Sequence, residues 1–303
     1  MRWEFLREEE FPAAIEKAGG LCVLPIGCLE MHGQHLPVGT DSLKAQALVE
    51  RAAEITGAVV FPTGLWLGDV IGAHKMQESS NKMKHGYIAL SPNLLQSILT
   101  ELCDEIARNG FRKILIVSSH GGNNAMLAYL LRSLDYNKRD YAVMTTKVWL
   151  TDLDADKILE KANADPEGFS MLTEEDYKVL AKFAETGAGG GHACFRETGL
   201  IYGLYPELVA PDRYEAVDGI TTHKGDYLYE AGLDTGAAWA LNCPNAYSGF
   251  PPHGCSHTIG LAMVKIVVDR LTKIFELIQN DENCVNVARG IPEYTPPIKP
   301  VKF

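Results

Sequence analysis

Short apolar segments alternate with amphipathic segments through the first half of this chain. The first of them, Leu21 to Ile26 (LCVLPI), is closed by Gly27, and AVVF, KILIVSS and YAVMTTKVW follow it at intervals. A continuous apolar run of this length is typical of a strand that is covered on both faces. The intervening segments, for example 42–55 and 91–110, carry apolar residues at helical spacing. This alternation predicts an α/β fold with a mostly parallel sheet and helices on both of its faces.

The second half of the chain adds two elaborations to this pattern. A charged segment at about 151–187 has the periodicity of surface helices. A segment at about 211–252, rich in glycine, proline and aromatic residues, has weak periodicity and is predicted to form long loops. A strong amphipathic pattern at 256–279 predicts a closing helix. Because no internal repeat or low-complexity tract divides the chain, we expect a single domain over residues 1–303.

The charge and the cysteines limit the class of function. A formal net charge of −11 and a pI near 5.3 argue against a general binder of nucleic acid or anionic membrane, because polyanions are repelled. No apolar run is long enough for a membrane span and the first residues lack the apolar core of a secretory signal, so we expect a cytoplasmic protein with a small-molecule substrate. The seven cysteines include no C-x-x-C pair, which favours buried free thiols over disulfides or a thiolate zinc site.

The segment from Gly27 to Asp41 (GCLEMHGQHLPVGTD) concentrates metal-capable side chains just after the first predicted strand. Ligand sites of open parallel sheets form beyond the carboxyl ends of the strands. Glu30 and His32 are two residues apart, so in an extended segment both point to the same side as ready metal ligands. Asp41 directly precedes a predicted helix, so it is either a helix cap or a third ligand. His35 lies at an odd spacing from His32, which favours a role outside the metal site.

Two later segments place histidines at the same edge of the sheet. SSHGGNN (118–124) follows the strand KILIV, so we expect His120 to project beside the first cluster and act as a ligand. Its two glycines also fit an anion-binding turn. GGGHACFRETG (189–199) carries His192 and Glu197 ahead of another apolar helix. The alternatives to functional roles for these two residues are a loop histidine and a first-turn carboxylate that answers the helix dipole.

Together these residues resemble the creatininase (creatinine amidohydrolase) family. Three family motifs are matched in the family's order: G-x-x-E-x-H-G-x-H-L-P-x-x-T-D from Gly27 to Asp41, a Gly-His-Gly-Gly-Asn turn at His120 to Asn123 with Ser119 as its first residue, and G-G-H-A at 190–193 followed by Glu197 and Thr198. The first motif is specific, and the other two add weight in combination. The resemblance implies a three-layer α/β/α sandwich with a mostly parallel central sheet.

The resemblance also implies a binuclear metal centre that hydrolyses a carbon–nitrogen bond. Carried over by motif, the ligands are Glu30, Asp41 and His120 for one metal, and His32 with the bridging Asp41 for the other. Creatininases complete the second metal with a glutamate at the position that is Gly122 here, so Glu197 is assigned to that vacancy. His192 falls on the family's catalytic histidine. Oxygen and imidazole ligands without a thiolate suit zinc, manganese or iron.

Departures from the family pattern leave the substrate open. Trp149 stands at one aromatic position of the family's creatinine pocket. Gly121 replaces an aromatic residue beside His120, and the tryptophan ahead of His192 is missing. We therefore assign Trp149 and Gly121 to the substrate pocket. We expect a substrate other than creatinine, such as another cyclic amide, a lactam, a formamide or a short peptide-like amide.

The prediction is a metal-dependent amidohydrolase that uses a water activated by two divalent ions on a small-molecule amide. The alternative is a binder of a small molecule or a phosphate compound that keeps the fold without the chemistry. The five residues Glu30, His32, Asp41, His120 and His192 together favour the enzyme, because a binder has no need of that set. Family members are commonly hexamers, so the resemblance implies a homo-oligomer in which the loops of 211–252 contact neighbouring subunits.

Overall fold

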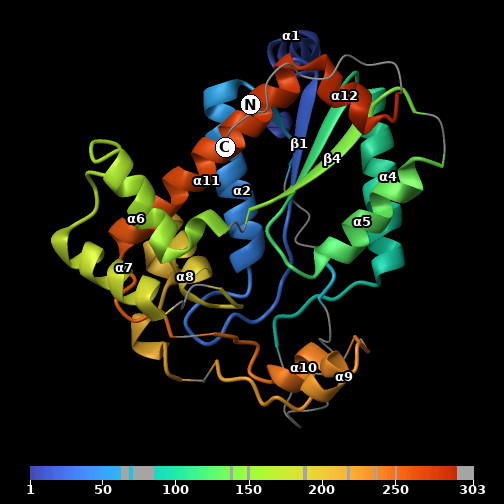
Figure 1. Ribbon diagram of the computed structural model, residues 1–303. Coiled ribbons are helices and arrows are strands. Elements are labelled where there is room, and N and C mark those ends of the chain that lie inside the picture. Colours follow the sequence, from blue (N-terminus) through green and yellow to red (C-terminus); the bar gives the residue numbers. More distant parts are fainter. Residues whose placement is uncertain are drawn as a thin grey trace.

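The protein is built around one parallel sheet. The computed structural model describes residues 1–62, 68–70, 85–136, 139–148, 151–186, 190–216, 219–233, 235–236, 238–249 and 251–291. Within them the strands are β1 (Leu21–Ile26), β2 (Val59–Val60), β3 (Lys113–Ser118) and β4 (Ala142–Lys147). Their order is β2-β1-β3-β4, and all neighbours are parallel (Figure 1). Ile26 pairs with Ser118, so the two central strands end side by side. The predicted parallel sheet is confirmed.

Helices cover both faces of this sheet. They are α2 (Thr40–Thr56) and α11 (His257–Asn280) on one side, and α4 (Pro92–Arg108) and α5 (Asn123–Leu134) on the other (Figure 1). Successive side chains of a strand point to opposite faces. Leu21 and Val23 accordingly join the hydrophobic core under α2 and α11, whereas Cys22 and Leu24 join the core under α4 and α5. The expected three-layer α/β/α arrangement is confirmed.

Local sequence signals set where two of these helices begin. α4 starts directly after Ser91, whose Oγ accepts a hydrogen bond from the backbone N–H of Leu94, and proline occupies its first position. α11 starts after Ser256, whose Oγ accepts from the backbone N–H of Ile259 at 3.0 Å. Both helices begin where the sequence predicts them.

The charged segment that follows β4 packs against the main core. It contains η3 (Thr151–Leu153), α6 (Ala155–Ala164) and α7 (Glu174–Thr186). Ile158 of α6 and Leu180 of α7 are fully buried in the core that α2 and α11 share. Asp176 links α7 to the start of α11, because its carboxylate accepts hydrogen bonds from Ser256 Oγ at 2.5 Å and Thr258 Oγ1 at 2.7 Å.

The last third of the chain reaches around the sheet. α8 (Phe195–Leu204) packs on α11 and is followed by η4 (Pro206–Leu208), η5 (Pro211–Arg213), α9 (Asp226–Glu230) and α10 (Ala238–Asn242). The predicted loop segment 211–252 therefore also contains short helices. Figure 1 shows α9 and α10 beyond the carboxyl ends of the strands, at the end of the molecule opposite α1 and α12.

The remaining elements lie near the two termini. They are η1 (Trp3–Phe5), η2 (Glu8–Glu10), α1 (Phe11–Lys17) and α12 (Glu282–Ala288). None of the helices in the described ranges combines the length and the apolar character that a membrane crossing requires.

Candidate metal centre

The predicted ligands and the predicted catalytic histidine, His192, converge at the carboxyl edge of the sheet, although they come from separate segments. They are Glu30 and His32 after β1, Asp41 in the first turn of α2, His120 after β3, and His192 and Glu197 before and within the first turn of α8. Gly27 makes part of this convergence possible, because a Cβ there would lie 2.4 Å from the backbone nitrogen of Ser42. Only glycine lets the start of α2 come this close to the end of β1.

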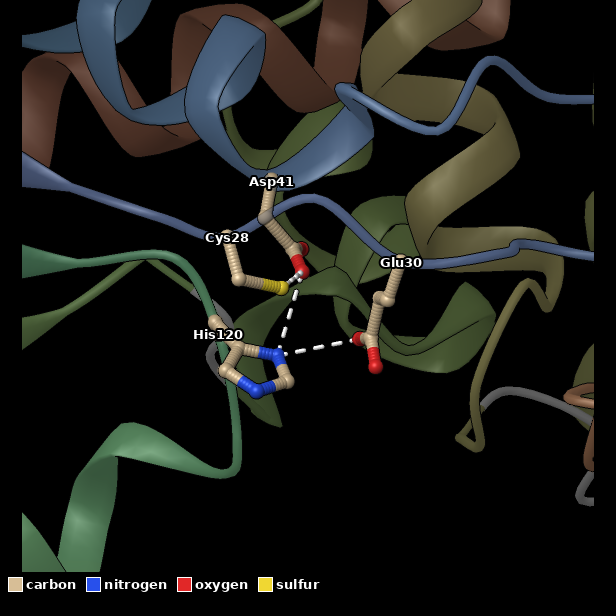
Figure 2. Close-up of side chains that lie close together, drawn as sticks. All are labelled: Cys28, Glu30, Asp41 and His120. Atoms are coloured by element: carbon tan, nitrogen blue, oxygen red, sulfur yellow. Dashed lines mark hydrogen bonds and ion pairs between the residues drawn. The ribbon is translucent and has the colours of Figure 1, made fainter. Parts of the chain in front are cut away.

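The first group of candidate ligands consists of Cys28, Glu30, Asp41 and His120 (Figure 2). His120 Nδ1 lies 3.0 Å from Glu30 Oε1 and 3.1 Å from Asp41 Oδ2. Cys28 Sγ lies 3.2 Å from the same Asp41 Oδ2. Metal-to-ligand bonds of about 2.0–2.3 Å place neighbouring donor atoms roughly 3–3.5 Å apart. The spacing of this group therefore fits one metal ion.

The second group uses the other oxygen of Asp41. His32 Nε2 lies 3.6 Å from Asp41 Oδ1 and 3.5 Å from Glu197 Oε2. His32 Nε2 is buried and has no hydrogen-bond partner among the described residues. Buried polar atoms without a partner are rare in proteins. A second divalent ion between these residues would satisfy the ring nitrogen, so the donor set fits two ions that share Asp41.

The three histidines of the site are oriented in the same way. Each donates one ring N–H to a backbone carbonyl oxygen: His120 Nε2 to Asp69 at 2.8 Å, His32 Nδ1 to Glu30 at 3.1 Å, and His192 Nε2 to Met31 at 2.8 Å. A carbonyl oxygen only accepts, so the proton sits on that nitrogen. The second nitrogen of each ring then faces the carboxylates. Proteins commonly orient metal-binding histidines by such hydrogen bonds.

The carboxylates of the site favour positive charge on the groups around them. Burial opposes a charge on His32, but the carboxylates of Glu197 and Asp41 outweigh it and raise the pKa of the imidazole to about 10. Burial likewise opposes a charge on His120, and the carboxylate of Glu30 raises the pKa of that ring well above its usual range. The field that favours a second proton on these rings also favours a divalent cation between them.

A buried lysine, Lys44, belongs to the site and was not predicted from the sequence. It is 2% exposed, and its Nζ lies 3.0 Å from Asp41 Oδ1 and 2.5 Å from Glu197 Oε1. Burial opposes its charge, but these two carboxylates outweigh the burial and raise the pKa of Lys44. The ammonium group therefore offsets one of the three carboxylate charges of the site.

Gly122 cannot carry the side chain that creatininases place there. A Cβ at this position would lie 2.2 Å from the carbonyl oxygen of Asp69 and 2.4 Å from His120 Nε2. The carbonyl oxygen of Asp69 and the ring of His120, which are joined by a hydrogen bond, thus fill the space that a side chain would need. Glu197 Oε2 lies 3.5 Å from His32 Nε2 and 3.7 Å from His192 Nδ1. The structure therefore brings a carboxylate to His32, as the assignment of Glu197 requires.

His35 lies outside both groups of candidate ligands. Its Nε2 is 3.0 Å from the carbonyl oxygen of Ala193 and 3.1 Å from Thr198 Oγ1, and its ring meets that of Tyr214 edge-on. Burial lowers the pKa of His35 to about 4, so the ring is neutral at pH 7. The contacts tie the segment after β1 to the start of α8, which is a structural role.

A cavity of about 430 Å³ opens onto the ligands. Its walls are formed by Glu30, Asp41, Ser119, His120, Gly121, Gly122, Gly191, His192, Arg196, Glu197, Trp239 and Ser248. Gly121 faces open space, since none of the described atoms lies within 4 Å of a Cβ built there. Trp239 of α10 stands edge-on to His192, with ring centroids 5.4 Å apart, and was not predicted. Trp149 lies outside the described residues.

The sequence is similar to known proteins of one family. The family model described as Creatininase: Creatinine amidohydrolase matches residues 4–275. The chain is 29% identical over 212 residues to Creatinine amidohydrolase of Pseudomonas putida, a match that covers 68% of this chain and 72% of that protein. It is 26% identical over 188 residues to Mycofactocin precursor peptide peptidase of Mycolicibacterium smegmatis, with 60% and 73% covered.

Solved creatininase structures share the fold. One named Creatininase Mn has a TM-score of 0.62 at 22% identity, covering 92% of this chain and 99% of that chain. A mutant creatininase of Zn-Zn type has a TM-score of 0.61 at 21% identity, covering 92% and 98%. At this identity the likeness concerns the fold alone, but the family match extends over nearly the whole sequence. This chain therefore belongs to the creatininase family of carbon–nitrogen hydrolases.

Proposed function

We propose that this protein hydrolyses a carbon–nitrogen bond of a small amide with a water activated by two divalent metal ions. The observation that carries the proposal is the position of Asp41, whose Oδ2 faces His120 and whose Oδ1 faces His32 within one buried site. A carboxylate in this position bridges two ions. Glu30 completes the position of His120, and Glu197 completes that of His32.

The residues around the ions have separate tasks. When bound, the two ions supply a water of lowered pKa and polarise the amide carbonyl. His120 and His32 are held as ligands by backbone carbonyls, so little side-chain freedom is lost on binding. Trp239 forms an apolar wall against which the substrate packs, and this wall keeps bulk water from one side of the cavity.

His192 is the group placed to move a proton. Its Nε2–H is held by the carbonyl of Met31, and its Nδ1 lies 3.7 Å from both Glu30 Oε1 and Glu197 Oε2. Its side chain is 16% exposed and lines the cavity, so it can contact a substrate. The ring nitrogen accepts a proton there and passes it to the leaving nitrogen, which would otherwise depart as a high-energy amide anion.

Zinc and manganese are the first candidates for the ions. Carboxylate oxygen and imidazole nitrogen suit both of these ions and also iron. The Mn and Zn-Zn forms of the related creatininases support the same two ions.

The cavity weighs against a binder of phosphate compounds. It is lined by three carboxylates, those of Glu30, Asp41 and Glu197. Its arginine, Arg196, is paired with Asp154, to which Nε donates at 2.9 Å. Among the described residues of the lining, Arg196 and His120 already face carboxylates, so a phosphate entering without metal ions would have to compete with Asp154, Glu30 and Asp41 for them. The enzyme is therefore the better-supported function.

The test combines metal content with hydrolysis. The protein is stripped with a chelator, reloaded with Zn²⁺ or Mn²⁺, and assayed against N-formyl compounds, small lactams, cyclic amides and short peptides. We expect two ions per chain and hydrolysis of at least one amide. The His192→Asn variant should keep its ions and lose activity. Bound ions without turnover of any substrate would favour the non-catalytic binder, and a protein that takes up no ions would reject the metal centre.

We further propose a cytoplasmic homo-oligomer, with the hexamer of related proteins as the expected form. Several large apolar side chains within 211–252 are strongly exposed, and contact with a neighbouring subunit would cover them. Ile220 is 75% exposed, Tyr227 66% and Leu233 58%. Light scattering coupled to gel filtration measures the mass in solution. The mass of a single chain at micromolar concentration would reject the oligomer.

A further inference from the structure

Cys28 stands inside the candidate metal centre, where none of the family motifs places a ligand. It is fully buried, and Figure 2 shows its sulfur directed at the carboxylate of Asp41, beside His120. Cys28, Glu30 and His32 are spaced two residues apart in the segment after β1, where Leu29 and His32 take part in isolated β-bridges. Alternation in such a segment points all three side chains to the same side. The backbone therefore presents the thiol to the site in the same way as the two predicted ligands.

We propose that Cys28 is the fourth protein ligand of the metal ion held by Glu30, Asp41 and His120. This inference rests on the proposed function, since it concerns the same metal centre. In a tetrahedral zinc site, bonds of about 2.3 Å to sulfur and about 2.0–2.1 Å to nitrogen or oxygen place sulfur roughly 3.5 Å from its neighbours. Cys28 Sγ is 3.2 Å from Asp41 Oδ2, and all four donor atoms lie within 4.8 Å of one another.

Ligation replaces a hydrogen bond that the thiol makes in the metal-free protein. In the structure the Cys28 thiol donates its S–H to Asp41 Oδ2, with the sulfur 3.2 Å from that oxygen. When a divalent ion binds, the S–H bond breaks, the proton leaves to solvent, and a sulfur–metal bond forms. Asp41 Oδ2 then loses the hydrogen bond from the thiol and binds the same ion instead.

A thiolate changes which ion the position prefers. Soft sulfur ligands favour zinc, cobalt and cadmium over manganese, whereas a set of carboxylates and imidazole alone discriminates less. Ligation by Cys28 therefore predicts that this position selects zinc over manganese. The remaining cysteines provide an internal comparison. Cys22 lies on β1, the strand that precedes Cys28, and is equally buried, but it packs in the core on the side of α4 and α5.

Cobalt provides a direct spectroscopic test, because Co²⁺ bound to a thiolate gives an intense near-ultraviolet charge-transfer band that Co²⁺ bound to oxygen and nitrogen lacks. The metal-free protein is titrated with Co²⁺ and its bound cobalt is counted. We expect the band in the wild type and in the matched control Cys22→Ala. It should be absent in Cys28→Ser and Cys28→Ala, with cobalt still bound.

The outcomes separate this inference from the proposed function. Bound cobalt without the band in the wild type would overturn ligation by Cys28 and leave the metal centre intact. No bound cobalt would reject the metal centre itself. The wild-type spectrum decides even if both Cys28 variants misfold. In a competition assay with a chelating dye, Cys28→Ser should also lower zinc affinity by about tenfold or more while changing manganese affinity less. Equal losses for both ions would contradict a thiolate ligand.

Discussion

At the scale of single residues, both candidate metal positions depend on Asp41. Its two oxygens face different groups of ligands, so Asp41→Ala removes one donor from each position. We expect this variant to lose both ions. Glu197→Gln weakens a contact to His32 only and should lose mainly one ion. Elemental analysis of the purified variants measures both effects. Full metal content in Asp41→Ala would exclude a bridge, and unchanged content and activity in Glu197→Gln would leave Glu197 with a role at the start of a helix.

The ammonium group of Lys44 pairs with Asp41 and Glu197, the two carboxylates of the metal position at His32. It neutralises part of their charge either in place of a metal ion or beside one. Lys44→Met removes the ammonium and leaves Asp41 and Glu197 buried with less compensation. Breaking a buried ion pair by removing one partner costs about 3–5 kcal/mol. We therefore expect the metal-free variant to unfold at a lower temperature. Because the carboxylates no longer share their charge with Lys44, zinc should then bind more tightly and restore more stability than it does in the wild type.

The matched control for this prediction is Lys113→Met. Lys113 is also buried, with Nζ 3.1 Å from the carbonyl oxygen of Gln279 and 3.1 Å from Glu282 Oε1, but it lies at the amino end of β3, away from the ligands. This variant should lose stability without changing the rise in melting temperature that zinc produces. If zinc raises the melting temperature of Lys44→Met no more than that of the wild type, the ammonium does not compete with the ion for these carboxylates.

At the scale of elements, continuous apolar runs predicted the central strands, because these strands are buried on both faces. Helical periodicity predicted α2, α4, α5 and α11, because each of these helices buries one face. Same-side spacing also predicted that Glu30 and His32 converge. The spacing applies equally to Cys28, whose interpretation as a buried free thiol followed from the absence of a C-x-x-C pair. Lys44 precedes Leu48 by four residues and so shares its buried helix face, which is a signal for a functional lysine. Both residues had a detectable signature in the sequence.

The boundary of α2 shows why local signals leave a site incomplete. The sequence left Asp41 open as either a helix cap or a ligand. In the structure the N-cap is Gly39, the helix begins at Thr40, and Asp41 lies in its first turn with its carboxylate turned into the site. A shift of one or two residues at a helix end is beyond what propensity resolves. Packing of α2 against the end of β1 at Gly27 decides the position.

The junction of α7 with α11 depends on pH through Asp176. Burial raises its pKa, but hydrogen bonds from Ser256, Thr173 and Thr258 outweigh the burial and lower the pKa. A lowered pKa in the folded state stabilises the protein at pH values above the unfolded pKa of about 3.9, and that stability is lost as the pH falls through the folded pKa.

Asp176→Asn should lower the free energy of unfolding by about 1–3 kcal/mol at pH 7. Urea unfolding at pH 7 and pH 3 should show the difference from the wild type shrinking in acid. A difference that is the same at both pH values would contradict a role for the charge.

At the scale of the whole molecule, the cavity combines segments that are far apart in the sequence. His120 and Gly121 follow β3, whereas Trp239 comes from α10 in a segment with weak periodicity. No local pattern shows that α10 lies over the carboxyl ends of the strands, because that placement depends on how the chain after α8 packs. The sequence therefore predicted a cavity with few aromatic residues, and the structure adds one from an unexpected direction.

Creatinine is predicted to be a poor substrate even so. Among the described atoms, none fills the space beside Gly121, and aromatic contacts contribute about 0.5–1.5 kcal/mol each beyond area burial, so a planar ring is held about two- to twelvefold less well for each partner that is missing. The open space instead admits a larger or non-planar amide. We expect kcat/KM for creatinine to fall below about 10⁴ M⁻¹s⁻¹, with at least one formamide, lactam or short peptide above it. Trp239→Ala should lower kcat/KM for the preferred substrate without changing metal content, and Trp239→Phe should retain most of it. A metal-loaded enzyme that turns over creatinine above this level, and faster than every other amide tested, would show that Trp239 and residues outside the described cavity wall hold the ring without an aromatic partner at Gly121.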